Sequence, residues 1–239
     1  ADSRPLYGQD ADFHSYDSEF QETLGCVCKL LSGHPPELGE YMKNLTKHLL
    51  YKGTDIGRQN VVWNIAGSFV YALASMVLSF LVIRVVGDGQ GGIFSFGFST
   101  LGQQMFIVAY FGIRPFQITD GTGEYSFGDY LEHRNITCIM ALAAGAVFLT
   151  FMHGVGRYPA DKCMILILLV IYKVIDGYAD VYESEFQRQG SLYLTGKSNF
   201  FRTLFSVSVF LVTLAAFEHL LFSCLAAVAA QAAGIALFN

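Results

Sequence analysis

Apolar residues in this chain are gathered into long blocks that are separated by short polar segments. An α-helix rises about 1.5 Å per residue, so crossing the roughly 30 Å of hydrocarbon in a bilayer takes about 20 residues. Six blocks approach that length, at about residues 61–86, 93–116, 136–152, 164–182, 201–217 and 220–238. The pattern predicts an all-α polytopic membrane protein whose six transmembrane helices occupy residues 59–239.

Residues 1–58 form the only long polar stretch, acidic near its beginning and basic near its end. Leu45, Leu49 and Leu50 have the spacing of one apolar face of a helix, so an amphipathic helix is possible before the first span. We expect a polar, cytoplasmic N-terminal tail, and its residues suggest no particular chemistry.

Lysine and arginine counts predict the orientation of the spans. Nine basic residues lie near the ends that would share a side with the N-terminus: Lys43, Lys47, Lys52, Arg58, Arg114, Arg134, Arg188, Lys197 and Arg202. Three lie near the opposite ends: Arg84, Arg157 and Lys162. Because basic residues concentrate on the cytoplasmic side of a membrane, both termini are expected in the cytoplasm.

Composition narrows the possible functions. The chain is 53% hydrophobic and only 15% charged, and its 20 acidic against 15 basic residues give a net charge of −5, so no basic field for nucleic acid is expected.

Cys26 and Cys28 form a C-x-C pair without the second pair that a zinc site needs, so no metal or other cofactor is predicted. Gly87, Gly89 and Gly92 match G-x-G-x-x-G, but between two apolar blocks they indicate a turn. The histidines are scattered and no catalytic motif occurs, so the sequence does not support an enzyme.

Polar stripes run along two of the apolar blocks. In the first span the stripe consists of Asn60, Asn64, Ser68, Tyr71, Ser75 and Ser79, and in the second of Ser95, Ser99, Gln103, Tyr110 and Arg114. The serines alone fit ordinary packing between membrane helices. The larger Asn64 and Tyr71 favour a wet cavity, because an unpaired amide in hydrocarbon costs several kcal/mol.

The fourth span carries the strongest polar signal, a face formed by Lys173, Asp176, Asp180, Glu183 and Gln187 at spacings of three and four. One intramembrane charge costs about 2.5–3.5 kcal/mol on insertion scales, so such groups usually pair or line a pathway. Lys173 could pair with Asp176. We predict instead that Asp176 and Asp180 face a water-filled cavity.

The same cavity is expected to include Asn64 and Gln103. Arg202, on the fifth span, could either join the cavity or extend to the headgroups. The third and sixth spans differ, because they carry small residues four apart and are expected to pack closely against neighbours: Ala141 and Gly145, and Ala226, Ala230 and Gly234.

Several short motifs occur in an order typical of one transporter family. Ile83-Arg84-Val85-Val86-Gly87 resembles its A-R-x-x-G, Gly91-Gly92-Ile93-Phe94-Ser95 its G-x-F-S, and Gly112-Ile113-Arg114-Pro115-Phe116-Gln117 its G-x-R-x-x-Q. Asp176, Asp180 and Gln187-Arg188-Gln189-Gly190 resemble its fourth span and exit, and Arg202 its next helix. Residues 60 to about 215 thus resemble polysaccharide (O-antigen type) flippases of the multidrug/oligosaccharidyl-lipid/polysaccharide superfamily.

The resemblance implies a transporter of the bacterial cytoplasmic membrane with two six-helix lobes around a cationic cavity. It implies that the chain is the N-terminal lobe, with a second lobe in the same or another chain, although residues 1–58 exceed the family's usual leader. The implied substrate is an undecaprenyl-pyrophosphate-linked oligosaccharide, which crosses by alternating access among membrane lipids. Arginines would bind the pyrophosphate, and amides and carboxylates the sugars. The candidate substrate-binding residues are Asn64, Arg84, Gln103, Arg114, Lys173, Asp176, Asp180 and Arg202.

Two alternative functions follow from the same pattern. A cation-coupled multidrug antiporter of the same superfamily would use Asp176 and Asp180 to bind sodium or protons. A polytopic membrane enzyme or an assembly protein is the third hypothesis. The basic groups among the candidate residues favour the flippase.

Overall fold

The computed structural model describes residues 55–121 and 123–238, and every regular element in these two ranges is a helix. In chain order they are α3 (Ile56–Ser95), the π-helix η1 (Phe96–Leu101), α4 (Gly102–Tyr110), α5 (Ile113–Thr119), α6 (Phe127–Gly154), α7 (Ala160–Arg188), α8 (Leu192–Phe217) and α9 (Leu220–Phe238). The all-helical prediction is confirmed for this part of the chain. Residues 1–54, which hold nearly all of the predicted polar tail, lie outside it.

Four helical segments of the described chain are long and apolar enough to cross a membrane: Ile56–Thr119, Phe127–Gly154, Leu192–Phe217 and Leu220–Phe238. These helices are those of a membrane protein, but the predicted count of six spans is not confirmed. The first two predicted spans form one helical run of 64 residues. α7 does not qualify, because Lys173, Asp176 and Asp180 interrupt its apolar stretch.

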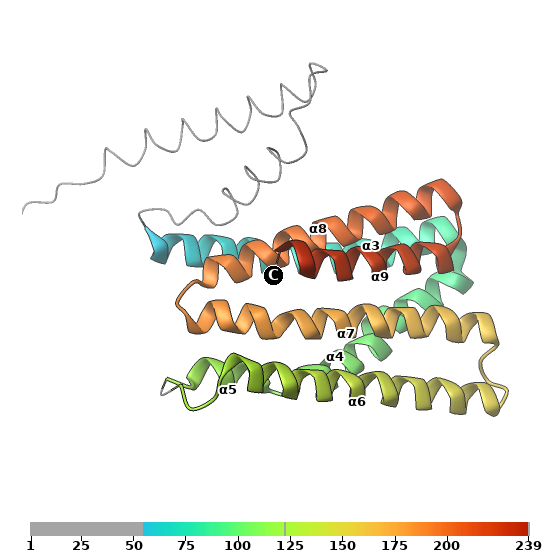
Figure 1. Ribbon diagram of the computed structural model, residues 1–239. Helices are drawn as coiled ribbons and strands as arrows, with labels where there is room; N and C mark the ends of the chain where they lie inside the picture. Colours follow the sequence, from blue (N-terminus) through green and yellow to red (C-terminus); the bar gives the residue numbers. More distant parts are fainter. Residues whose placement is uncertain (1–54, 122, 239) are drawn as a thin grey trace, which may run out of the picture. The chain divides into compact units, whose positions relative to one another are not determined.

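The long run Ile56–Thr119 is broken at two points. At Gly87 the backbone leaves the helical region, with φ 79° and ψ 172°, and the chain turns back on itself (Figure 1). This glycine lies in the predicted turn, where a positive φ suits a residue without Cβ. Further on, Phe111 and Gly112 both have left-handed conformations, with φ 41° and 70°, and they separate α4 from α5. The π-helical turn η1 lies between these two breaks.

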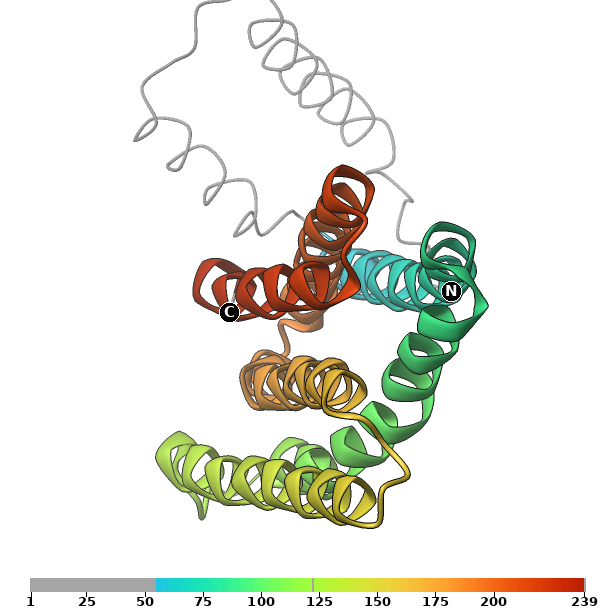
Figure 2. The same cartoon turned by 90° about the vertical axis from the view of Figure 1, so that its right-hand side faces the viewer.

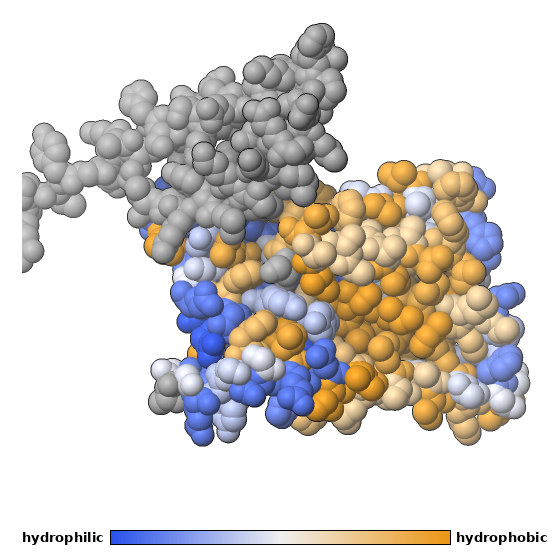
Figure 3. All heavy atoms as spheres, viewed as in Figure 1, coloured by the Kyte–Doolittle hydropathy of each residue, from blue (hydrophilic) through white to orange (hydrophobic). Residues whose placement is uncertain are grey.

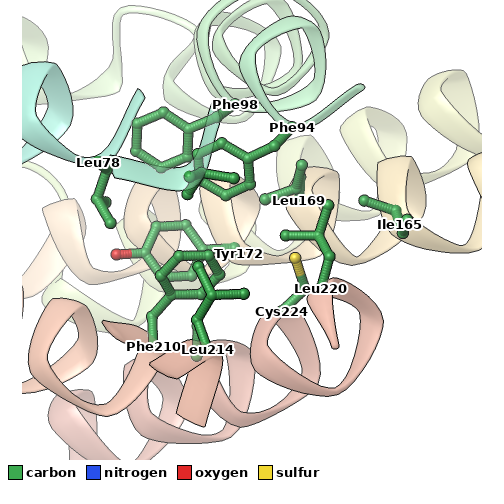
Figure 4. Packing of buried hydrophobic residues seen from close by; sticks show 12 residues of the cluster. Leu78, Phe94, Phe98, Ile165, Leu169, Tyr172, Phe210, Leu214, Leu220 and Cys224 are labelled. Atoms are coloured by element: carbon green, nitrogen blue, oxygen red, sulfur yellow. The ribbon is translucent and has the colours of Figure 1, made fainter. Parts of the chain in front are cut away.

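α7 is the central helix, with α6 on one side and α8 and α9 on the other (Figures 1 and 2). It also packs against α4, α5 and η1. One apolar core joins α3, η1, α7, α8 and α9, and in Figure 4 the rings of Phe94, Phe98, Tyr172 and Phe210 lie together at its centre. A second core joins η1, α4, α6 and α7 around Ala141, Leu166 and Val170. α7 is therefore largely shielded from the surroundings of the protein.

The outer surface of the bundle is apolar over much of its length. α3 exposes a row of large side chains that includes Val61, Ile65, Phe69 and Phe80, and α6 exposes Val147. Figure 3 shows hydrophobic residues over most of the coloured surface, with hydrophilic residues gathered mainly near the end where α5 lies. Apolar residues outside and charged residues inside are typical of a protein surrounded by lipid.

The predicted packing role of small residues is confirmed. A Cβ at Gly145 would lie 3.0 Å from Val170, and a Cβ at Gly234 would lie 2.8 Å from Cγ of Arg202. α3 and α8 also approach closely, because a Cβ at Gly67 would lie 2.6 Å from the carbonyl oxygen of Gly196. Small residues therefore bring helix backbones together and leave room for the Arg202 side chain.

Candidate functional site

The charged face of α7 is buried inside the bundle. Lys173, Asp176, Asp180 and Glu183 are 3%, 7%, 6% and 6% exposed, as the helical spacing brings them to the side that α3, α5, α6, α8 and α9 cover. The expectation that Asp176 and Asp180 face a water-filled cavity is wrong for this part of the chain. Both carboxylates are instead satisfied by side chains of neighbouring helices, which removes the cost of placing a lone charge in a membrane protein.

Asp176 receives hydrogen bonds from three other helices. Its Oδ1 accepts from Nη2 of Arg202 on α8 at 2.9 Å and from Nε2 of Gln231 on α9 at 3.2 Å. Its Oδ2 accepts from the Tyr71 hydroxyl on α3 at 3.1 Å. Asp176 thus joins α7 to α3, α8 and α9.

Lys173 is not paired directly with Asp176. Its ammonium donates to the Tyr71 hydroxyl at 2.9 Å and lies 4.1 Å from the centroid of the Phe98 ring. Cation–π attraction and one hydrogen bond therefore hold this buried cation in place. The Tyr71 hydroxyl links the two charged groups, because it accepts a hydrogen bond from Lys173 and donates one to Asp176.

Asp180 lies one turn further along α7 and binds two arginines. Nη1 of Arg114, on α5, lies 2.5 Å from Oδ1, and Nη2 of Arg134, on α6, lies 2.9 Å from Oδ2. The other amino group of Arg134 donates to the carbonyls of Ala109 and Tyr110 at 2.8 and 3.0 Å. These carbonyls belong to the end of α4, where the chain breaks, so Arg134 satisfies groups that would otherwise lack helical partners.

Glu183 connects the two carboxylates into one network. It lies 3.0 Å from Arg202 Nη2 and 3.8 Å from Arg114 Nη1. The network has seven charged members: Lys173, Arg114, Arg134, Arg202, Asp176, Asp180 and Glu183. Four cations against three carboxylates leave one net positive charge.

Near the end of α7, beyond the predicted span, a second set of polar contacts continues from the network. Arg114 Nη2 donates to Gln187 at 2.9 Å, and Glu185 accepts from Gln117 at 3.0 Å and from Arg188 at 2.9 Å. Burial opposes the ionisation of Glu185, but hydrogen bonds from Arg188, Gln189 and Gln117 outweigh it and lower the pKa of this carboxyl. α5 and α7 are therefore joined by side-chain contacts at this end.

Five of the eight predicted site residues come together in the network: Arg114, Lys173, Asp176, Asp180 and Arg202. The other three do not. Arg84 is exposed beside the Gly87 break, and Asn64 and Gln103 are half-buried on α3 and α4. Within the described ranges, the side chains of Asn64 and Gln103 make no hydrogen bond.

Several residues that were read as loop or boundary charges lie inside helices. Arg202 is buried with two carboxylates, so it does not extend to the headgroups. Lys197 is also buried, because α8 begins at Leu192 rather than after the predicted loop. The basic residues counted for the predicted orientation include four that lie inside helices: Arg114, Arg134, Lys197 and Arg202. The predicted orientation therefore depends on fewer loop charges than the sequence indicates.

The sequence prediction missed four members of the site, since Glu183, although on the predicted charged face of α7, is not among the eight candidate residues. Arg134 was counted only as a flanking charge, although it is fully buried. Tyr71 was recognised as part of a stripe but not as a partner of charges. Gln231 was overlooked, and its signal was present, because it is the one amide in the otherwise apolar sequence of α9. A lone amide in such a helix requires a partner, which here is Asp176.

No protein-family model, curated protein or solved structure matches this chain. Among the residues that the structure describes, no cluster of His, Cys, Asp and Glu could hold a metal ion. The site is therefore characterised by its charges alone: an ionic network built around one central helix, with Arg114 as its most exposed cation.

Proposed function

We propose that this chain is a six-helix, membrane-spanning lobe of a flippase that moves a lipid-linked oligosaccharide across the bacterial cytoplasmic membrane. The observation that carries the proposal is the charge network on α7, enclosed in a bundle with an apolar exterior. Buried ionic networks of this kind in membrane helices are typical of transport proteins. The choice of substrate rests on the resemblance of the motifs around Arg84, Arg114 and Gln187 to those of polysaccharide flippases.

Six spans result if the Gly87 break divides two of them and α7 is counted as one. α7 has 29 residues, which correspond to about 43 Å of helix and exceed the hydrocarbon thickness. Its charges do not argue against a span, since other helices cover them. In this arrangement the N-terminus is cytoplasmic and a second six-helix lobe completes the transporter.

Arg114 is the network residue best suited to meet an anionic substrate. Its side chain is 22% exposed, whereas Arg134 is fully buried, and a guanidinium can bind a phosphate in a bidentate manner. The network's net positive charge would add to the attraction of a pyrophosphate. Asn64 and Gln103, half-exposed and without side-chain partners in the described ranges, are suited to sugar hydroxyls.

The antiporter alternative has less support. Asp176 and Asp180 each accept from donors on both oxygens, so a sodium ion or a proton would have to compete with these donors. No catalytic cluster appears among the charged residues of the network, so an enzyme is also less well supported than transport.

The test is to delete the gene in its native host and follow the lipid-linked oligosaccharide in each leaflet. We expect the precursor to accumulate on the cytoplasmic leaflet and surface polysaccharide to disappear. The intact gene should restore export, and Arg114→Gln should not, while Arg58→Gln, which removes an exposed arginine at the start of α3, serves as the matched control. An unchanged precursor distribution after deletion would refute the proposal.

A further inference from the structure

A surface groove lies between α6 and α7, near the turn that joins them and away from the charge network. Its volume is about 360 Å³. Small side chains create the hollow, because Ala146 on α6 and Ala160 and Cys163 on α7 leave space between the two helices. Leu149, Met164 and Ile167 supply apolar walls. The groove is therefore an apolar site that is as wide as the gap between α6 and α7.

The groove opens on the part of the bundle expected to face lipid. The α6 residues Val147 and Phe151 beside it are 69% and 64% exposed, and α6 is long and apolar enough to span a membrane. Figure 1 places the α6–α7 turn at the end of both helices, and Figure 3 shows hydrophilic residues at that edge beyond a hydrophobic surface. If α6 spans the membrane, the walls would lie at the depth of acyl chains and the turn at the depth of headgroups.

Cationic groups stand in the turn at the end of the groove. Arg157 is exposed, and the Lys162 ammonium is held 3.8 Å from the centroid of the Tyr158 ring. His153, which lines the groove, makes a 2.9 Å contact through Nδ1 with the Tyr158 carbonyl oxygen. Asp161 is the one carboxylate between residues 153 and 164, so the turn has a net positive charge.

Backbone hydrogen bonds hold the conformation of the turn. Gly156 has φ 72°, and the N–H groups of Arg157 and Tyr158 donate to the Met152 carbonyl at 3.0 and 3.2 Å. A left-handed glycine with such bonds is a common way to end a helix. The backbone that carries Arg157 and Tyr158 is therefore fixed at the end of α6, next to the groove.

An apolar groove with cations in the turn at its end matches the acyl chain and the headgroup of one molecule. We infer that the α6–α7 groove binds a phospholipid with an anionic headgroup, one acyl chain lying along Ala146 and Ile167 and the phosphate near Arg157 and Lys162. The net positive turn favours an anionic over a zwitterionic headgroup. This site is separate from the charge network and does not depend on the proposed transport.

Native mass spectrometry of the full chain in detergent tests the site directly. The protein is titrated with phosphatidylglycerol or with phosphatidylcholine of the same acyl chains, and retained lipid is counted. We expect tighter binding of phosphatidylglycerol. Arg157→Gln and Lys162→Gln should each weaken it about fivefold, as one basic residue near an anionic headgroup contributes about that factor. Ala146→Phe, which fills the groove, should weaken both lipids.

The matched control is Arg58→Gln, which removes another exposed arginine, at the start of α3, and should leave lipid binding unchanged. Equal retention of both lipids would overturn the inference, and so would an equal loss of phosphatidylglycerol in Arg58→Gln. Full binding in Ala146→Phe would exclude the groove. Displacement of phosphatidylglycerol by millimolar inorganic phosphate would indicate a free-anion site and would also overturn it.

Discussion

Lys173 and Asp176, one turn apart on α7, are joined through the hydroxyl of Tyr71 rather than to each other. The hydroxyl accepts from Lys173 at 2.9 Å and donates to Asp176 at 3.1 Å. A direct pair would have tied α7 only to itself. The inserted tyrosine instead ties α7 to α3, and it leaves Asp176 Oδ1 free to accept from α8 and α9.

The first prediction concerns this hydroxyl. Tyr71→Phe keeps the ring beside Lys173 but leaves the buried ammonium without its hydrogen-bond acceptor and Asp176 with one donor fewer. We expect a loss of about 1–3 kcal/mol in the free energy of unfolding, the usual cost of an unsatisfied buried polar group. Denaturant titration of the purified protein in detergent would measure it.

Tyr178→Phe is the matched control for that experiment. Tyr178 is on α7 and half-exposed, and its hydroxyl makes one long contact of 3.4 Å with Tyr182. Its removal should change stability by less than about 0.5 kcal/mol. Equal stabilities for the Tyr71 and Tyr178 variants would mean that Tyr71 does not connect the two charges.

The second prediction concerns Arg134, which binds both Asp180 and the end of α4. Arg134→Met should destabilise the protein by about 3–5 kcal/mol, because it removes one charge of a buried pair. Combining it with Asp180→Leu should cost less than the sum of the single changes, because each single change already removes the ion pair between Arg134 and Asp180. Unfolding measurements on the two single variants and the double variant give the coupling energy, and strict additivity would contradict the direct pairing.

The third prediction tests the crossing of α3 and α8. A Cβ at Gly196 would overlap the Trp63 carbonyl, and because the clash is with backbone it cannot be relieved by a change of rotamer. Gly196→Ala should therefore destabilise the bundle by at least about 1–3 kcal/mol, as overpacking does. Gly89→Ala, where the added methyl meets nothing within 4 Å, should be neutral or slightly stabilising. Thermal unfolding of both variants in detergent would separate a local clash from a general effect of removing glycine.

The sequence predicted the helices better than their ends. Five of the six apolar blocks each fall within a single helix, because length and hydropathy alone identify a helix that suits lipid; the block at 93–116 is divided among α3, η1, α4 and α5. α6 begins at Phe127, well before the predicted start near residue 136, and the signal was local: Ser126 and Asp129 form a capping box. The start of α8 is harder to predict, because Lys197 resembles a loop charge in the sequence although it is buried.

The partners of the charged face could not be predicted in the same way. Helical spacing correctly placed Asp176 and Asp180 on one side of α7. Their partners Arg114, Arg134 and Arg202 come from three other helices, and a single sequence contains no signal that fixes such distant contacts. The prediction of a hydrated face was therefore wrong because it could not include the side chains of neighbouring helices that cover this face of α7.

The last prediction compares the two partners of one ion pair, Asp180 and Arg114, in their effects on folding and on transport. Asp180→Asn leaves Arg134 buried without a carboxylate, so it should lower the abundance of the protein in the membrane as well as export. Arg114→Gln leaves Asp180 paired with Arg134 and removes a half-exposed cation, so abundance should remain close to that of the unmodified protein while export falls at least tenfold, about 1.4 kcal/mol. Quantitative blotting of membranes beside an assay of surface polysaccharide distinguishes the two effects. If Arg114→Gln reduced abundance as strongly as Asp180→Asn, Arg114 would be a structural member of the network rather than its contact with substrate.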